Sequence, residues 1–192
     1  MCHSPSFSTA LTLILKYEGG FVNDPSDKGG ATNKGITTAT YNSYRKSKNL
    51  PLQSVALITD SEVADIYSAQ FWAPLKCDSI SLVSQGLAIC VFDTSVNSGI
   101  GEAALFLQRA IGATADGVIG PGSLKALQTN FNDATISNYL QQRKDFYKAL
   151  TVKDPTQLKF LAGWNNRVDN LKTFIASLPK KTPLVNLGGA TK

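Results

Sequence analysis

The sequence predicts a mainly α-helical fold, and three observations support this. Apolar residues recur at intervals of three and four in several segments, which places them on one face of a helix. Signals that start helices precede such segments, among them the capping box Thr59-Asp60-Ser61-Glu62 and Pro121. Residues 19–38 are instead rich in Gly, Asn, Asp and Thr, which predicts a loop with a short β-hairpin around 21–22 and 36–37.

The helices follow in order along the chain. A first helix over residues 8–18 begins at Ser8 or Thr9 and ends at the double glycine that follows it. In the last long helix, which opens at Pro155, one apolar stripe continues to Leu178. The other predicted helices cover residues 59–72, 83–98 and 102–111, and two more begin at Pro121 and after a cap at Asp133. In the helix capped by Asp133, we expect Arg143 to add only the aliphatic stem of its side chain to the apolar face.

The change in composition near residues 76–84 predicts two lobes. The first, residues 1–80, holds the polar loop, and the second, residues 81–178, is nearly all helical. Residues 179–192 carry Pro, Lys and Gly without periodicity and predict a loose tail. We do not expect the lobes to fold independently, because the first helix cannot bury its own apolar face.

Composition and charge narrow the class of protein. With 43% hydrophobic and 17% charged residues the chain is globular, and its net charge of +5 favours an anionic polymer as partner. The basic residues are scattered and no nucleic-acid motif occurs, so we expect no nucleic-acid partner. No apolar stretch approaches the roughly 20 residues that span a bilayer, and no Sec signal is recognised, so we expect cytoplasmic synthesis and no stable membrane insertion.

Histidine and cysteine usage excludes several chemistries. The only histidine is His3, which argues against a Ser-His-Asp triad or a His-rich metal site. The odd set Cys2, Cys77 and Cys90 has no zinc-site spacing, although a bridge between the last two stays open. We therefore expect no metal and no cofactor, and a reaction carried by carboxylates, hydroxyls and amides.

Glu18 is the principal candidate catalytic residue. It continues the apolar stripe of the first helix from Leu11, Ile14 and Leu15, at the end where the helix carries partial negative charge. Burial and the helix end both favour the protonated form of a carboxyl group. Such an acid can protonate the leaving oxygen of a glycosidic bond.

The polar loop after Glu18 supplies the groups that such a reaction needs. Gly19 and Gly20 allow a sharp turn and the approach of a bulky ligand. Glycoside hydrolysis uses two carboxylates, or one carboxylate and a positioned water, and Asp24 and Asp27 are candidates for the second. Thr32 and Thr37 add hydroxyl groups. The alternative is that Asp27 caps a turn, that both threonines satisfy loop backbone groups, and that Glu18 pairs with Lys16 or Lys28.

The segment from Glu18 to Thr37 resembles the signature of glycoside hydrolase family 108, in which the catalytic glutamate precedes a double glycine. These enzymes are N-acetylmuramidases, found as phage endolysins and toxin-secretion muramidases. The resemblance implies a lysozyme-like helical fold and cleavage of the β-1,4 bond between N-acetylmuramic acid and N-acetylglucosamine. The order Glu18, Asp27, Thr32 also resembles, more loosely, phage lysozymes of the T4 type, with a spacing to Thr32 that is one residue shorter.

Downstream segments resemble the peptidoglycan-binding region of the same family. They are residues 92–99, 107–110, 116–121, 146–147 and 163–168. The resemblance implies that residues 1–80 form a catalytic muramidase lobe and that 81–178 include a peptidoglycan-binding region. As substrate contacts we predict Asn97, Thr37 and Trp72, although Asn97 could instead end a helix and Trp72 could belong to the core. Asp93, inside an apolar helix, needs a hydrogen-bonding partner if it is buried.

Two alternatives to the muramidase stay open at this point. A lytic transglycosylase would cut the same bond with one acid and leave an anhydro sugar, and a non-catalytic module would only bind peptidoglycan. For a muramidase we expect a bacteriolytic, antimicrobial phage endolysin that acts as a monomer on the cell wall in the periplasm. Release would need a separate export factor such as a holin, and a toxin-release muramidase fits the same sequence features.

Overall fold

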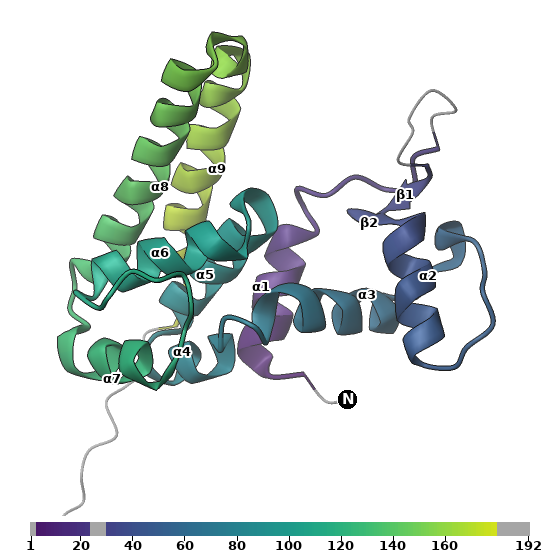
Figure 1. The fold of residues 1–192 in the computed structure, drawn as a ribbon, viewed down its shortest axis with the longest axis horizontal. Coiled ribbons are helices and arrows are strands. Elements are labelled where there is room, and N and C mark those ends of the chain that lie inside the picture. Colours follow the sequence, from purple (N-terminus) through teal and green to yellow (C-terminus); the bar gives the residue numbers. More distant parts are fainter. Residues whose placement is uncertain (1–2, 24–29, 180–192) are drawn as a thin grey trace, which may run out of the picture.

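The computed structural model describes residues 3–23 and 30–179. The fold is mainly α-helical with one small antiparallel sheet, as predicted (Figure 1). The elements, in chain order, are α1 (Pro5–Ile14), β1 (Thr32–Asn33), β2 (Ile36–Thr37), α2 (Thr38–Ser47), η1 (Val55–Leu57), α3 (Asp60–Tyr67), η2 (Ser68–Trp72), α4 (Cys77–Val83), α5 (Gln85–Ser98), α6 (Ile100–Ala110), α7 (Pro121–Asn130), α8 (Thr135–Lys153), η3 (Pro155–Gln157) and α9 (Leu158–Ala176).

The first helix lies earlier in the chain than predicted. Ser4 caps it, since the Ser4 hydroxyl accepts a hydrogen bond from the backbone N–H of Phe7, and Pro5 occupies the first helical position. The regular helix ends at Ile14, and a turn follows. The backbone N–H of Glu18 still donates to the carbonyl of Ile14 at 3.2 Å, so Glu18 keeps the helical register of the buried stripe.

The β-hairpin pairs different residues from those predicted. Thr32 and Asn33 pair with Thr37 and Ile36, whereas Val22 makes only an isolated bridge to Thr32. Two residues with positive φ, Lys34 at 50° and Gly35 at 74°, connect the strands. A two-residue turn of this kind matches the twist of the strands that it joins. The positive φ of Gly35 agrees with the tight turn that its sequence predicts at this position.

Helix α2 was not predicted, because its sequence has no apolar stripe. Its buried side chains are Tyr41 and Arg45, and Thr37 caps its N-terminus. Glu62 of α3 holds both in place: its carboxylate accepts hydrogen bonds from Arg45 Nη1 at 2.7 Å and from the Tyr41 hydroxyl at 2.8 Å. The capping box predicted at the start of α3 is confirmed, with the backbone N–H of Thr59 donating to Glu62.

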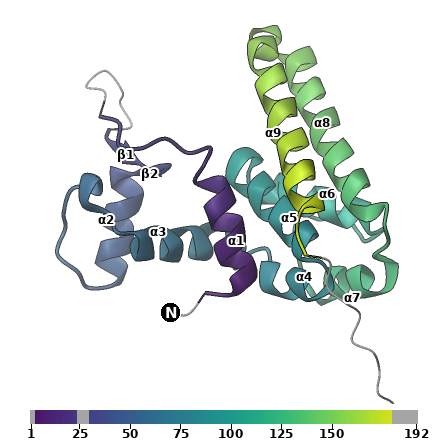
Figure 2. The ribbon, with the colours of Figure 1, turned by 180° about the vertical axis from the view of Figure 1, so that it is seen from behind.

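Helix α5 is the centre of the core. Its residues from Gly86 to Ser95 are all buried; those up to Phe92 are apolar or Gly, and Asp93 is the one charged side chain among them. It packs against α1, α4, α6, α8 and α9 (Figures 1 and 2). Cys90 of α5 and Cys77 of α4 are free, so no bridge joins them. Burial raises the pKa of both thiols, which keeps them protonated and unreactive.

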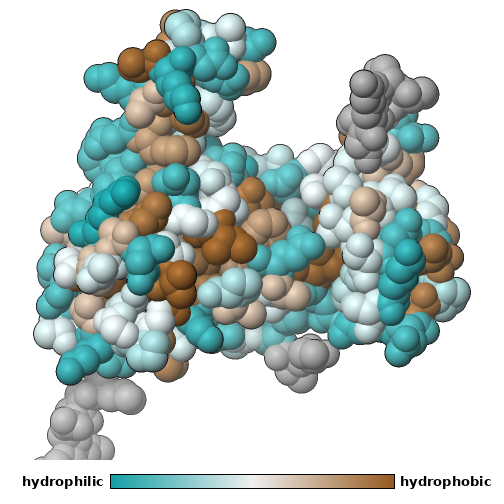
Figure 3. All heavy atoms as spheres, viewed as in Figure 1, coloured by the Kyte–Doolittle hydropathy of each residue, from teal (hydrophilic) through white to brown (hydrophobic). Residues whose placement is uncertain are grey.

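Helices α8 and α9 form a long antiparallel hairpin that projects from the rest of the molecule (Figures 1 and 2). In the space-filling view the hairpin stands above the neighbouring surface (Figure 3). The C-terminal end of α1 lies between the α8–α9 hairpin and the part that holds β1, β2 and α2 (Figure 1). Two other expectations differ: Ala134, not Asp133, occupies the cap position of α8, and α9 begins after a 3₁₀ turn at Pro155.

The remaining sequence predictions concern membrane insertion, the division into two lobes and the C-terminal tail. In the described part of the chain, no helix combines the length and apolar character that crossing a bilayer requires. The predicted division into residues 1–80 and 81–178 stays a prediction. The tail predicted over 179–192 lies outside the described residues from residue 180 on.

We expect Glu62→Gln to lower the free energy of unfolding at neutral pH by about 2 kcal/mol, because charged hydrogen bonds to Arg45 and Tyr41 are lost. Burial acts to raise the pKa of Glu62, but the hydrogen bonds and the charge of Arg45 outweigh it and hold the pKa below its ordinary value of 4.5. The ionised form therefore stabilises the fold above that value and stops doing so as the pH falls. Urea unfolding at pH 7 and pH 3 measures this: the difference between wild type and variant should shrink at pH 3. An equal difference at both pH values would contradict it.

Candidate active site

Glu18 lies in the turn that follows α1. Its side chain is 24% exposed, so it is partly buried and still reachable from solvent. No described atom lies within 4 Å of a Cβ built on Gly19 or Gly20, which follow. The predicted approach of a bulky ligand on this side stays a prediction.

A small cavity of about 130 Å³ adjoins Glu18. It lies where the β1–β2 turn, α2, the end of α3, η2 and α5 converge. Besides Glu18 its lining consists of Gly35, Ile36, Thr40, Ile66, Tyr67, Gln70, Phe71 and Val96. Gln70 and Phe71 belong to η2, a π-helical turn, and such turns are frequent at functional sites.

Gly35 touches the carboxyl group of Glu18. A Cβ placed on Gly35 would lie 2.8 Å from Glu18 Oε2 and 2.6 Å from the hydroxyl oxygen of Tyr67. Its φ of +74° also disfavours any other residue. The turn of the hairpin therefore packs directly against the candidate acid and limits where its carboxyl group can lie.

Tyr67 fixes the same turn from the other side. Its hydroxyl donates a hydrogen bond to the carbonyl of Lys34 at 3.0 Å. Burial raises the pKa of Tyr67, and the nearby charge of Glu18 raises it further. The phenol stays neutral near physiological pH and acts as a donor that holds the turn.

Arg167 of α9 reaches the other oxygen of Glu18. Its Nη1 lies 4.0 Å from Glu18 Oε1, and its guanidinium carbon lies 4.6 Å from the centre of the Tyr17 ring. Nε and Nη2 of the same group donate to the carboxylate of Asp93, with a shortest distance of 2.8 Å. This two-pronged contact sets the direction in which the third nitrogen points.

Asp93 is fully buried in α5 and needs two partners. The second is Arg143 of α8, whose Nη1 donates to Asp93 at 2.5 Å. The expectation that Arg143 adds only its stem to the apolar face is wrong: its whole side chain is buried and its guanidinium also donates to Tyr147 and Asn97. Burial acts to lower the pKa of Arg143, but the charge of Asp93 raises it above its ordinary value, so Arg143 stays positively charged.

The predicted substrate contacts lie in different places. The Asn97 side chain accepts hydrogen bonds from Tyr147, at 2.5 Å, and from Arg143. The Thr37 hydroxyl accepts from the backbone N–H of Thr40 and so caps α2, while Thr32 lies opposite Thr37 in the hairpin. Neither threonine is among the described residues that line the cavity at Glu18. The roles of these three residues stay predictions.

The predicted role of Trp72 in substrate binding is wrong. Trp72 is 1% exposed, and its ring packs edge-on against Phe7 and Phe92 at centroid distances of 5.4 and 5.3 Å. No face of the indole is open to a sugar. The aromatic residue belongs to the core instead, which was the alternative interpretation of the sequence.

The predicted second carboxylates, Asp24 and Asp27, lie outside the described residues. The ends of the segment that carries them are joined, because Val22 and Thr32 exchange two backbone hydrogen bonds of 2.8 Å. Asp93 cannot replace them as a base, since both of its oxygens are bonded to arginines.

The sequence predicts a tight turn at Gly35 in the loop that serves Glu18, and the structure has this turn. Sequence reasoning missed Tyr67, Gln70 and Arg167 as residues of the site. These three come to Glu18 from distant parts of the chain, and a single sequence carries no signal for that.

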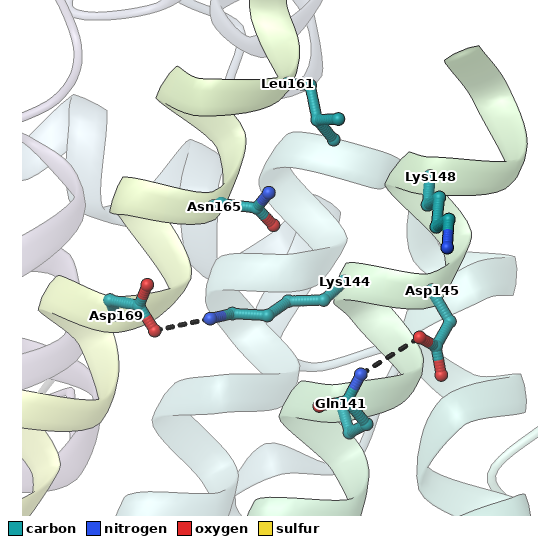
Figure 4. A pocket seen from close by; sticks show the side chains of 7 residues that line it. All are labelled: Gln141, Lys144, Asp145, Lys148, Leu161, Asn165 and Asp169. Atoms are coloured by element: carbon teal, nitrogen blue, oxygen red, sulfur yellow. Dashed lines mark hydrogen bonds and ion pairs between the residues drawn. The ribbon is translucent and has the colours of Figure 1, made fainter.

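A larger cavity of about 520 Å³ lies along the α8–α9 hairpin (Figure 4). Its two carboxylates are both bonded: Asp169 accepts from Lys144 at 2.6 Å and Asp145 accepts from Gln141 at 2.9 Å. Both carboxylates are therefore engaged within the hairpin itself. Over residues 3–23 and 30–179, no group of three or more His, Cys, Asp or Glu side chains is placed to hold a metal ion.

Comparisons with known proteins match both parts of the chain. Residues 11–99 match the family described as Glycosyl hydrolase 108, and residues 102–169 match the one described as Predicted Peptidoglycan domain. The structure of Brucella abortus SagA is similar to the chain at 28% identity and a TM-score of 0.71, over 93% of this chain and 98% of that one. No curated protein matches the chain in sequence.

We expect Gly35→Ala to reduce hydrolysis of purified peptidoglycan by about 100-fold, because the new methyl group displaces the carboxyl of Glu18. Gly30→Ala is the matched control, since Gly30 has a similar φ of +72° but open space around its Cβ. Both changes should cost about 1 kcal/mol of stability from backbone strain. Turbidity loss and thermal unfolding measure the two effects. Equal activity in the two variants would show that crowding at Glu18 is unimportant.

Proposed function

We propose that this chain is an N-acetylmuramidase with Glu18 as its general acid. It belongs to the glycosyl hydrolase 108 family and carries a peptidoglycan-binding region. At the coarser level the chain is a peptidoglycan hydrolase. The finer proposal is that it cleaves the β-1,4 bond between N-acetylmuramic acid and N-acetylglucosamine.

The observation that carries this proposal is the position of one carboxyl group. Glu18 lies beside a cavity, with Gly35 against one oxygen and Arg167 near the other. Fixing an acid in this way favours proton transfer, because its carboxyl group needs little reorganisation when substrate binds. Gly19 and Gly20, which follow it, add no side chain that would crowd a bound glycan.

In the proposed reaction Glu18 gives its proton to the oxygen that links the two sugars. The bond from this oxygen to the anomeric carbon breaks, and positive charge develops on the sugar ring. A water molecule then adds its oxygen to the anomeric carbon and passes one proton to a carboxylate, that of Glu18 or Asp27, so that the reaction consumes one water and no net proton. Asp27 places this water or supports the developing positive charge, and Thr32 lies at the base of the segment that carries Asp27. Asn97 and Thr37 are proposed contacts to the glycan.

The decisive variant is Glu18→Gln, which keeps the shape of the side chain and removes its transferable proton. We expect at least about a 10³-fold loss of activity on purified peptidoglycan, with the thermal midpoint nearly unchanged. Glu102→Gln is the matched control: it makes the same chemical change in the first turn of α6, away from the cavity, and should stay active. If Glu18→Gln keeps near-normal activity, the proposed function is wrong.

Mass analysis of the products separates hydrolysis from the lytic transglycosylase reaction. Hydrolysis adds one water per bond cut and leaves a reducing sugar, so we expect no fragments that lack this water. Anhydro fragments, lighter by one water, would assign the chain to the second reaction. Binding of peptidoglycan without any fragments would identify a non-catalytic module.

The biological setting is part of the same proposal. A bacteriolytic, antimicrobial phage endolysin that works as a monomer fits the net charge of +5, because bacterial envelopes are anionic. In this setting the protein is made in the cytoplasm and reaches the wall in the periplasm through a separate factor such as a holin. Lysis of cells only when such a factor is co-expressed would support this arrangement.

A further inference from the structure

We propose that Arg167 is a positioning residue for Glu18, so that the C-terminal region does more than bind peptidoglycan: it completes the catalytic centre. Glu18 lies within the part of the chain that matches the glycosyl hydrolase family, whereas Arg167 lies within the part that matches the peptidoglycan domain family. The inference rests on the proposed role of Glu18 as the acid.

The geometry of the guanidinium group is the first step. Two of its nitrogens, Nε and Nη2, donate to Asp93, and the remaining one, Nη1, lies 4.0 Å from Glu18 Oε1. A guanidinium is planar and rigid, so binding two nitrogens fixes the position of the third. Tyr17, which precedes Glu18 in the chain, covers the face of the same group. Arg167 is only 13% exposed, and these contacts hold it in one place.

The charge balance is the second step. One buried carboxylate, Asp93, lies between two guanidinium groups, those of Arg143 and Arg167. The three groups together carry one excess positive charge. When Glu18 gives its proton to the substrate, its carboxyl group becomes negative and faces this charge. A fixed positive group close to the site where negative charge develops stabilises the transition state.

The origin of each group is the third step. Asp93 comes from the central helix α5, Arg143 from α8 and Arg167 from α9, whereas Glu18 follows α1. The α8–α9 hairpin therefore contacts the acid through a buried ion-pair network and not through a flexible surface residue. Activity should depend on the hairpin even for substrates too short to reach its distal end.

The test compares Arg167→Gln with Arg167→Lys on short soluble peptidoglycan fragments, with kcat and KM measured separately. We expect Arg167→Gln to lower kcat by about 100-fold and to leave KM within about twofold, since the lost interaction acts in the transition state. Arg167→Lys keeps the charge but not the two-pronged contact, so it should recover part of kcat. Asp93 keeps Arg143 as a partner in both variants, and circular dichroism with thermal unfolding checks the fold.

Lys144→Gln is the matched control. It removes one positive charge from the same hairpin and breaks the ion pair between Lys144 and Asp169, which lies in the cavity of Figure 4. The net charge and the attraction to the anionic wall change equally in Lys144→Gln and Arg167→Gln, yet we expect normal kcat for Lys144→Gln. A second variant applies if Arg167→Gln unfolds too readily to be assayed. Tyr17 is exposed and its ring covers the guanidinium of Arg167, so Tyr17→Leu should loosen Arg167 and lower kcat by about threefold.

A double variant shows whether Arg167 acts through Glu18. Glu18→Gln with Arg167→Gln should be no slower than Glu18→Gln alone, because the second change removes support for an acid that is already absent. A normal kcat for Arg167→Gln, or a rise in KM alone, overturns this inference while Glu18→Gln remains inactive and the proposed function stands. Full activity in Glu18→Gln overturns both.

Discussion

The carboxylate of Asp93 is fully buried at the centre of the fold and bonded to two guanidinium groups. Burying a charge is costly, and removing one partner of such a pair typically destabilises a protein by about 3–5 kcal/mol. Asp93 accepts hydrogen bonds from Arg143 of α8 and from Arg167 of α9, and these contacts offset the cost of its burial. They join the helical hairpin to the central helix α5, and they also direct the remaining nitrogen of Arg167 toward Glu18.

Glu18 is constrained from both halves of the chain. On one side, the tight turn at Gly35 and the hydroxyl of Tyr67 limit the space around its carboxyl group. On the other, Arg167 supplies a positive charge whose direction Asp93 sets. Gly19 and Gly20, which follow Glu18, carry no side chain that could crowd it. An acid held in a defined position and still reachable from solvent suits the proton transfer that the proposed hydrolysis requires.

This dependence gives the two family matches a physical connection. Considered separately, residues 11–99 would be a catalytic part and residues 102–169 a binding part. The ion pairs of Asp93 join them, because Asp93 belongs to the first match and both arginines belong to the second. The similarity to Brucella abortus SagA likewise extends over 93% of this chain, so both parts are shared in one arrangement and not as separate modules.

The sequence by itself determined the helical class, the stripe that ends at Glu18, the capping box before α3 and the need of Asp93 for a partner. These follow from local rules of spacing and capping, which a single sequence displays. It did not show α2, whose burial depends on an ion pair with Glu62, nor that Trp72 is enclosed by Phe7 and Phe92. Above all, it did not show that Arg167, 149 positions after Glu18 (167 minus 18), lies beside it. Only the packing of α9 against α5 decided that, because contacts between distant segments arise from the burial of shared surfaces and leave no periodic pattern in either segment.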